Sequence, residues 1–322
     1  MKLRFAAATL AAAVLSAPAG AQCSTAATEV RQACYAATDF FTYLSPQFAT
    51  ALAGGSSTLG QSGSLGGLGR FALSLRGTGI INGVMPEIGD GGFNINGQPK
   101  SYTVKDQIIP GAGLDAAVGL TKGFNLGATR VGGIDLLVSA LYIPDVDEND
   151  VSVKAKDGNL KLGYGVRVGL LDESLVVPGV YASYLARDLP TFTVTGTSDG
   201  GGSGVGGTFS LNDFTVKTTA VRLVAAKNFL VLGLQAGVGQ DSYKGSTGIS
   251  ATVQGQQASG SSSFSMTRTN VFVGASLNLF LVKVVGEYGQ VSGGKLPSVF
   301  NSFDKAADGS RTYGSLGLRI AF

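Results

Sequence analysis

The sequence predicts an all-β protein, a closed antiparallel barrel of about ten strands that spans a membrane and follows an N-terminal amphipathic helix. Charged residues make up only 14% of the chain, well below the about 25% of typical soluble domains. Short stretches in which apolar residues alternate with small or polar ones recur along it. After residue 21, no stretch approaches the about 18 continuous apolar residues of a membrane-spanning helix. A soluble secreted β-sandwich or β-solenoid is the alternative fold.

Residues 1–21 have the features of a secretory signal peptide. Lys2 and Arg4 precede an apolar core from Phe5 to Leu15, and Ala19-Gly20-Ala21 fits a cleavage site with small residues. We therefore expect secretion through the inner membrane followed by cleavage. Removing the leader changes the net charge from +3 to +1, since 22 basic and 21 acidic residues remain. That balance does not indicate a nucleic acid partner.

Residues 22–55 are predicted to form a helix that could plug a barrel, and residues 56–69 a Gly/Ser-rich linker. Apolar residues recur at steps of four and three along one helix face: Val30, Cys34, Ala37, Phe41, Leu44 and Phe48. Pro46 should break or kink this helix, and Gly54-Gly55 should end it. The linker would let the helix enter a barrel lumen or lie beside the barrel.

Cys23 and Cys34 are the only cysteines, and a secreted chain meets an oxidising compartment, so we expect a disulfide. If both lay in one helix, their Cα atoms would be about 16 Å apart, whereas a disulfide needs about 4.4–6.8 Å. The pair therefore requires Cys23 to lie outside the helix and to fold back onto it. The alternative is two free thiols.

Residues 70–322 are predicted to form the barrel. Ten alternating stretches lie near the about 9–11 residues of a membrane-spanning strand: 71–80, 108–121, 130–143, 158–171, 176–188, 214–227, 230–241, 266–279, 281–291 and 311–322. Short connections between them alternate with long polar ones, among which 189–213 and 242–265 are expected to be flexible loops. Segments 192–197 and 208–214 also alternate, which leaves twelve strands or tall strand extensions open.

The last strand alternates strictly and ends in an aromatic residue. It resembles the closing strand and assembly signal of Gram-negative outer-membrane β-barrel proteins, with Leu318, Ile320 and Phe322 as the signal residues. The resemblance implies an outer-membrane location, contact with membrane lipids, assembly by the barrel-assembly machinery, and short turns on the periplasmic side. Two sets of aromatic residues fit the interfaces of such a barrel: Phe124, Phe229, Phe280 and Phe322 at the periplasmic edge, and Tyr142, Tyr184 and Tyr288 at the other.

The inward face of the strands carries charges and glycines. The charged candidates for the lumen lining are Arg76, Asp115, Asp135, Lys161, Arg167, Arg187, Lys283, Glu287 and Arg319. Basic residues outnumber acidic ones, which fits either a constriction that favours anions or paired charges that brace the wall. The inward glycines are Gly111, Gly113, Gly119, Gly163, Gly165, Gly233, Gly237 and Gly239. They indicate room for a guest, preferably the N-terminal helix and otherwise a solute, or a relief of curvature.

The chain contains no His, and known outer-membrane barrel enzymes resemble one another in needing one. We therefore expect no enzyme, no cofactor and no His-based metal site. The acidic segment 145–150 lacks the spacing of a calcium-binding helix–loop–helix and fits a solvated loop better than a Ca²⁺ site.

A tethered helix in front of a barrel loosely resembles the long-chain fatty acid transporter class, which places an N-terminal plug inside its barrel. That class has longer chains and more strands, so no residue role is carried over. The expected function is a pore or transporter for small or hydrophobic solutes that the N-terminal helix gates. The alternative is a non-conducting structural or adhesive barrel that displays its long extracellular loops.

Overall fold

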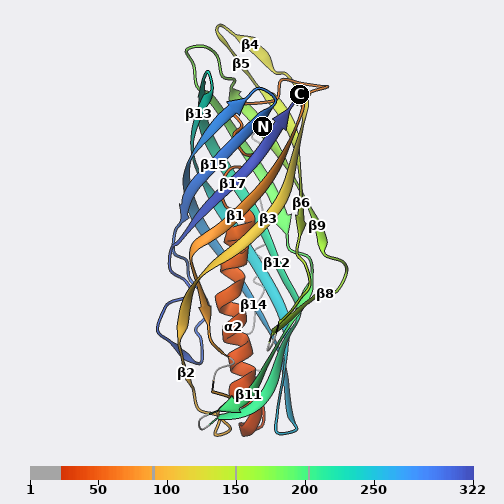
Figure 1. Ribbon diagram of the computed structural model, residues 1–322, viewed down its shortest axis with the longest axis vertical. Helices are drawn as coiled ribbons and strands as arrows, with labels where there is room; N and C mark the ends of the chain where they lie inside the picture. Colours follow the sequence, from red (N-terminus) through yellow and green to blue (C-terminus); the bar gives the residue numbers. More distant parts are fainter. Residues whose placement is uncertain (1–22, 89–90, 149–150, 202–203) are drawn as a thin grey trace, which may run out of the picture.

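The structure is a computed structural model that describes residues 23–88, 91–148, 151–201 and 204–322, so the predicted signal peptide lies outside the described residues. Within these ranges it has one long helix, α2 (Thr28–Ala53), and a ring of ten strands (Figure 1). The ring strands are β1 (Phe71–Pro86), β3 (Val104–Thr121), β6 (Gly133–Tyr142), β9 (Leu160–Leu171), β10 (Gly179–Asp188), β12 (Gly204–Phe229), β13 (Leu232–Val253), β14 (Gln256–Leu279), β15 (Val282–Val291) and β17 (Arg311–Ala321).

The ten ring strands correspond to the ten predicted stretches. Their spatial order is β10-β9-β6-β3-β1-β17-β15-β14-β13-β12, with antiparallel neighbours, and β12 pairs again with β10. Where the first and last strands meet, the backbones of Phe71 and Phe322 exchange hydrogen bonds of 3.0 and 2.9 Å. Leu318 and Phe322 are about half exposed and Ile320 is partly exposed, whereas Arg319 between them is buried. The predicted two-faced last strand is therefore confirmed.

The two ends of the ring differ. At the end that we call the turn end, the connections 122–132, 172–178, 230–231 and 280–281 are short, and the first and last strands start and stop there (top of Figure 1). One of these connections holds the small hairpin β4 (Phe124–Leu126) and β5 (Thr129–Val131). The opposite end, which we call the loop end, carries the longest connections as well as the two-residue turn 254–255 between β13 and β14.

The prediction of flexible loops at 189–213 and 242–265 is wrong, because most of these residues extend the wall at the loop end. Strands β12, β13 and β14 continue as one tall sheet, and β11 (Phe192–Gly201), β8 (Val151–Ala155) and β7 (Val146–Glu148) pair beside it. Every second side chain of the extension faces α2 and is buried: Tyr243, Ile249, Ala251, Val253, Phe264 and Met266. Burial against the helix stabilises these Gly- and Ser-rich strands.

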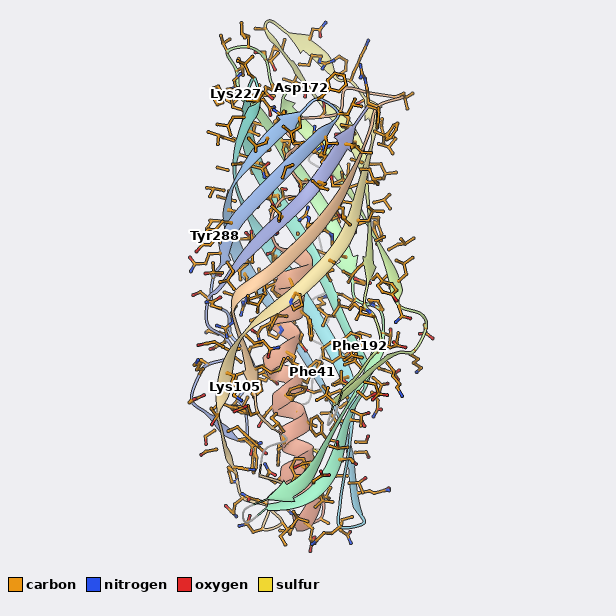
Figure 2. All side chains as sticks on the ribbon, in the orientation of Figure 1. Phe41, Lys105, Asp172, Phe192, Lys227 and Tyr288 are labelled. Carbon is orange, nitrogen blue, oxygen red and sulfur yellow. A yellow bond between two sulfur atoms is a disulfide. The ribbon has the colours of Figure 1, made fainter. Side chains whose placement is uncertain are left out.

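Large apolar side chains cover the outer face of the ring. The predicted phenylalanines Phe124, Phe229, Phe280 and Phe322 are exposed at the turn end. The predicted tyrosines Tyr142, Tyr184 and Tyr288 are also exposed, farther toward the loop end. Figure 2 shows Tyr288 on the outer surface about midway along the molecule. An apolar outer face with inward polar residues is the arrangement of strands in a lipid bilayer.

None of the helices in the described ranges has the length and apolar character that a membrane span requires.

The predicted break at Pro46 is wrong, because α2 continues through it from Thr28 to Ala53. Pro46 lacks a backbone N–H, but its own carbonyl accepts a hydrogen bond from the Thr50 hydroxyl at 2.8 Å. The helix is buried on nearly all sides, and packing of this extent outweighs the about 3 kcal/mol helix penalty of proline. The predicted end is correct, since the helix stops directly before Gly54.

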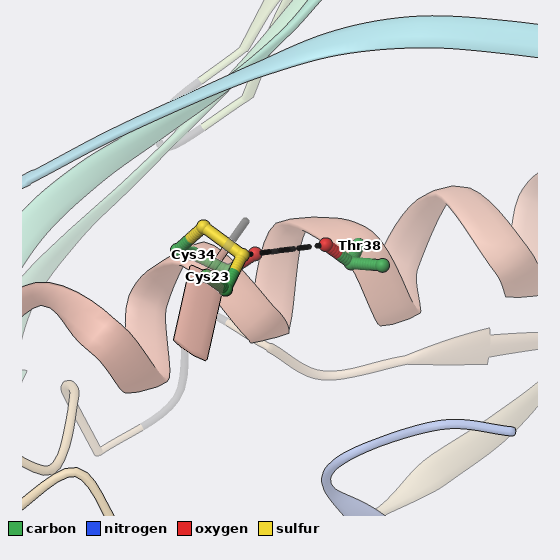
Figure 3. Close-up of a disulfide and its surroundings, with 3 residues drawn as sticks. All are labelled: Cys23, Cys34 and Thr38. Atoms are coloured by element: carbon green, nitrogen blue, oxygen red, sulfur yellow. Dashed lines mark hydrogen bonds between the residues drawn. A yellow bond between two sulfur atoms is a disulfide. The ribbon is translucent and has the colours of Figure 1, made fainter. Parts of the chain in front are cut away.

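Cys23 and Cys34 form a disulfide, and their Cα atoms are 5.7 Å apart (Figure 3). Cys23 precedes the first residue of α2 and folds back against its second turn, as the length argument requires. The Cys23 sulfur also lies 3.8 Å from the Thr38 hydroxyl. The bridge holds the residues before α2 against the second turn of the helix.

Replacing both cysteines by serine should loosen the N-terminal end of α2 without opening the ring. Closing a loop of this length stabilises a fold by about 3 kcal/mol, and only the helix start depends on it. We expect faster proteolysis near residues 23–34 with unchanged heat-modifiable migration of the folded protein on gels. Equal proteolysis of the variant and the natural protein would contradict this role.

Candidate functional site

Helix α2 lies inside the ring and its loop-end extension (Figure 1). A Cβ on Gly97, in the loop-end connection between β1 and β3, would lie 3.1 Å from Thr28, which places the start of α2 at the loop end. The helix ends beside Tyr313, at a ring level near Tyr288. Residues 54–69, which we call the lumen segment, then run through the rest of the ring to the turn end, where Gly67 contacts Lys122. The sequence places this stretch in a linker, and the structure places it inside the ring.

The loop-end connection 292–310 holds the first half of α2. The Asp39 carboxylate accepts hydrogen bonds from the backbone N–H groups of Phe300 and Asn301 at 3.1 and 2.9 Å, and from the Asn301 amide at 2.8 Å. The Tyr35 ring stacks on Phe300 with centroids 3.9 Å apart. Burial raises the pKa of Asp39 to about 6, against the opposing effect of these hydrogen bonds. This contact closes one side of the loop end over the helix.

The middle of α2 binds the wall through both polar and aromatic contacts. The Gln47 side chain donates to the Val84 carbonyl at 2.7 Å and accepts from its N–H at 2.8 Å. Val84 lies just beyond a register shift between Ile80 and Gly83 in β1. The Gln47 side chain there forms the backbone hydrogen bonds that a neighbouring strand forms elsewhere along β1. Phe41, inside the loop-end half in Figure 2, packs edge-on against Phe214 and Phe264 with centroids 5.4 and 5.9 Å apart.

Two wall arginines bind the carbonyl groups that end α2. Arg187 donates to the Leu52 carbonyl at 3.0 Å, and Arg222 donates to the Ala53 carbonyl at 2.8 Å and to the Gly55 carbonyl at 3.0 Å. The last carbonyls of a helix lack intrahelical partners and carry the negative end of its dipole. The last turn of α2 has no basic residue of its own, so the wall supplies the cations.

The first residues of the lumen segment bind both Arg76 and Glu287 of the wall. Arg76 donates to the carbonyls of Gly54 and Ser56 at 3.1 and 2.7 Å. The Glu287 carboxylate accepts from the Ser56 N–H at 3.2 Å and from its hydroxyl. Donors and acceptors of the segment are thus matched by wall charges of the complementary sign.

The same pattern continues toward the turn end. Lys283 and Arg319 both donate to the Gly60 carbonyl, at 3.0 and 3.1 Å. Farther along, the Asp135 carboxylate accepts from the Leu65 N–H at 3.1 Å, and Asp172 accepts from the Ser64 N–H at 3.1 Å. The lumen segment is therefore hydrogen-bonded to the wall along most of its length.

The wall charges also pair with one another. Asp115 lies between Arg76 and Arg187, at 3.0 and 2.7 Å. Arg167 pairs with Asp135 at 2.8 Å, and Arg222 pairs with Asp241 at 2.5 Å. Buried charges require such partners. Backbone carbonyls of α2 and the lumen segment accept further hydrogen bonds from Arg76, Arg187 and Arg222.

Eight of the nine predicted lumen charges belong to this network, and Lys161 does not. Lys161 shares the parity of Arg167 on β9 but lies exposed near the loop end. The sequence prediction also omitted Arg222, Asp241 and Asp172. The signal for Arg222 was present, since the outward-facing Val221 and Leu223 flank it in a predicted strand. Asp172 gave no such signal, because it lies in a short turn.

The predicted lumen glycines divide into two groups. Gly111 contacts Ala51 of α2, and Gly119 contacts Gly67 of the lumen segment, so both make room for the N-terminal chain. Most of the others make room within the wall; for example, a Cβ on Gly237 would meet the Phe272 ring at 2.4 Å. Four further glycines of the wall also make room for the lumen segment: Gly133, Gly169, Gly179 and Gly317.

No protein family model matches the chain, and no curated protein matches it. Solved structures of outer-membrane barrel proteins do match. The match to Neisserial surface protein A has a TM-score of 0.29 at 10% identity, and it covers 79% of this chain and 97% of that protein. The toluene transporter TodX of Pseudomonas putida matches with a TM-score of 0.29 at 12% identity, covering 84% and 98%. The outer membrane protease OmpT of Escherichia coli gives 0.30 at 13% identity, covering 79% and 96%. Similarity at this level carries no inference, so the fold rests on the strand pairing of this chain.

Replacing Arg222 by alanine should destabilise the protein more than replacing Arg222 and Asp241 together by leucine. The single change leaves a buried carboxylate without its cation, which costs about 3–5 kcal/mol. The double change removes both charges. Urea unfolding in detergent, followed by circular dichroism, compares the two variants, and a double variant as unstable as the single one would contradict the bracing role.

The contact between Asp39 and the 292–310 connection should weaken as the pH rises. The pKa of Asp39 is raised from 3.8 to about 6 by burial, so the folded protein retains a proton that the unfolded chain has released. This contribution to stability is full below about pH 4 and is lost as the pH rises through about 6, by up to about 3 kcal/mol.

Amide hydrogen exchange at residues 300–301, corrected for the intrinsic pH dependence, measures this contact. We expect protection to fall from pH 4 to pH 7 in the natural protein and to stay nearly constant in the Asp39→Asn variant, which does not titrate. Parallel pH profiles for both proteins would contradict the assignment.

Proposed function

We propose that this chain is an outer-membrane β-barrel of Gram-negative type, closed and ten-stranded, whose own N-terminal chain plugs its lumen. The barrel conducts a small or hydrophobic solute when the end of α2 and the lumen segment leave their sites on the wall. The observation that carries this proposal is the set of wall arginines bound to backbone carbonyls between Leu52 and Gly60. The turn end then faces the periplasm, and the loop end faces outward.

The contrast between the two halves of the plug supports a gate rather than a permanent filling. α2 buries apolar and aromatic side chains against the tall wall of β12 to β14. The lumen segment instead consists largely of Gly, Ser and Thr and binds through hydrogen bonds that water could replace. Each hydrogen bond to a charged group contributes about 1.5–3 kcal/mol. Water that enters the lumen can replace these bonds, whereas the apolar contacts of α2 are lost outright when water surrounds them.

The outer surface supports the membrane position. Leu316 and Leu318 of the last strand are 67% and 50% exposed, and Phe280 at a turn is 99% exposed. In water such a continuous apolar surface would favour aggregation, whereas in lipid it is the stable arrangement. The outward face of β17 that holds Leu318, Ile320 and Phe322 is also the surface on which the barrel-assembly machinery would act.

The second candidate is a non-conducting barrel that displays its loop end. The observation that favours it is the rigid extension of β11 to β14, which α2 packs from inside. The outer face of this extension is polar and includes the exposed Lys244, Ser246 and Ser263. Under this candidate the plug is structural and never leaves. Neither candidate function involves catalysis or a cofactor.

A disulfide between the end of α2 and the wall should lock the gate. A Cβ on Gly111 would lie 3.5 Å from the Ala51 Cβ, within the about 3.5–4.5 Å that a disulfide needs. We expect the Ala51→Cys, Gly111→Cys variant, made with Cys23 and Cys34 replaced by serine, to show fewer single-channel openings when oxidised. Reduction should restore the openings, and the two single-cysteine variants should not respond. Equal activity in both redox states would favour the displaying barrel.

Deleting residues 22–60 should raise the conductance, because the deletion removes α2 and the first half of the lumen segment. The measurement is single-channel recording of protein whose folding is shown by heat-modifiable migration. An unchanged conductance of the folded deletion variant would count against a plug.

A further inference from the structure

An apolar groove of about 390 Å³ lies on the outer face of the ring at the turn end. It runs between β1 and β3, and its lining includes Gly69, Arg70, Phe71, Leu73, Ala116 and Val118. Phe71 pairs with Val118 and Leu73 with Ala116 across the two strands. Ala116 presents only a methyl group between the larger Leu114 and Val118, which hollows the surface there. The volume falls within the about 300–1,000 Å³ of ordinary ligand sites.

Cations gather at one end of this groove. Arg70 is exposed, and its backbone N–H donates to the Gly67 carbonyl at 3.3 Å. Lys122 lies against the same bend, since a Cβ on Gly67 would be 3.2 Å from its Cβ. Lys122 is also exposed, and within the described ranges neither cation has a carboxylate within 4.0 Å. The nearby Arg130 differs, because it pairs with Asp172 at 3.2 Å.

The apolar groove and the two cations together indicate one kind of occupant. The groove faces outward among lipid-facing side chains, so an acyl chain fits it. Arg70 directly precedes Phe71, whose ring stacks on that of Phe322 at the turn-end edge of the apolar surface, and Lys122 follows the end of β3 at the same end of the ring. The nearby Leu68 is 82% exposed. At that level a lipid presents its headgroup, and basic residues attract anionic headgroups.

We propose that this groove is a binding site for one anionic glycerophospholipid of the leaflet at the turn end. One acyl chain lies along Leu73, Ala116 and Val118, and the phosphate is held by Arg70 and Lys122. The site rests on the membrane position proposed above. It borders the seam between β1 and β3 and the bend at Gly67, where the lumen segment leaves the ring, so a bound lipid would stabilise the exit of the plug.

The test is native mass spectrometry of the mature protein extracted from nanodiscs of phosphatidylcholine with added phosphatidylglycerol. We expect the natural protein to retain one phosphatidylglycerol. In the Arg70→Gln, Lys122→Gln variant, the fraction of protein that retains the lipid should be about tenfold lower. Ala116→Leu, which fills the groove and leaves both cations, should also lose the lipid. The control variant, Lys217→Gln, Lys244→Gln, loses the same charge from the outer faces of β12 and β13. It should retain the lipid as well as the natural protein does.

The outcomes separate this site from the proposed function. Loss of retention with both groove variants supports the site. Loss in the charge variant alone would show surface attraction without a groove and overturn it, as would equal retention by all variants. Heat-modifiable migration and incorporation into nanodiscs are measured for every variant. If the natural protein does not enter a bilayer, the membrane function fails together with this site, whereas insertion without selective retention overturns only the lipid site.

Discussion

Buried guanidinium groups in the lumen need hydrogen-bond acceptors, and this requirement organises the molecule. Arg76, Arg187 and Arg222 lie inside the ring with only Asp115 and Asp241 as direct carboxylate partners. An unsatisfied buried charge costs several kcal/mol, so the remaining N–H groups must bind something else. The carbonyls at the end of α2 meet this need, because a helix C-terminus offers acceptors and a favourable dipole together. Wall and plug therefore each satisfy groups that the other would leave buried and unpaired.

The two parts of the plug follow from this constraint. Where the wall carries charges, the N-terminal chain is a non-helical segment rich in Gly and Ser, because its backbone must reach the wall groups directly. Where the wall is apolar, at the loop end, the chain is a helix with Phe41 and Leu44 buried. Glycines of the wall fit the same division: Gly317 admits Leu59, and Gly179 admits the Ser62 backbone. The N-terminal chain is thus largely apolar in its contacts at the loop end and polar within the ring.

Much of the ring could be predicted because its information is local. Period-two patterning placed the ten strands and the outward face of Leu318 and Phe322, and side-chain parity placed Arg167 and Arg319 inside. The tall wall at 242–265 was missed because Gly- and Ser-rich strands become stable only when a helix covers them, which no local pattern reveals. The continuous helix through Pro46 was missed for the same reason, since burial outweighs propensity. Asp172 and the lumen segment required knowledge of which chain lies opposite.

The N-terminal chain lies inside the ring from the loop end to the turn end. The most direct measurement is single-channel recording of the unmodified mature protein, refolded and inserted into a planar bilayer in KCl. We expect a closed state interrupted by brief openings, because the lumen segment must break its contacts with Arg76, Glu287 and Arg319 before ions pass. A steady, large conductance from protein shown to be folded would contradict it.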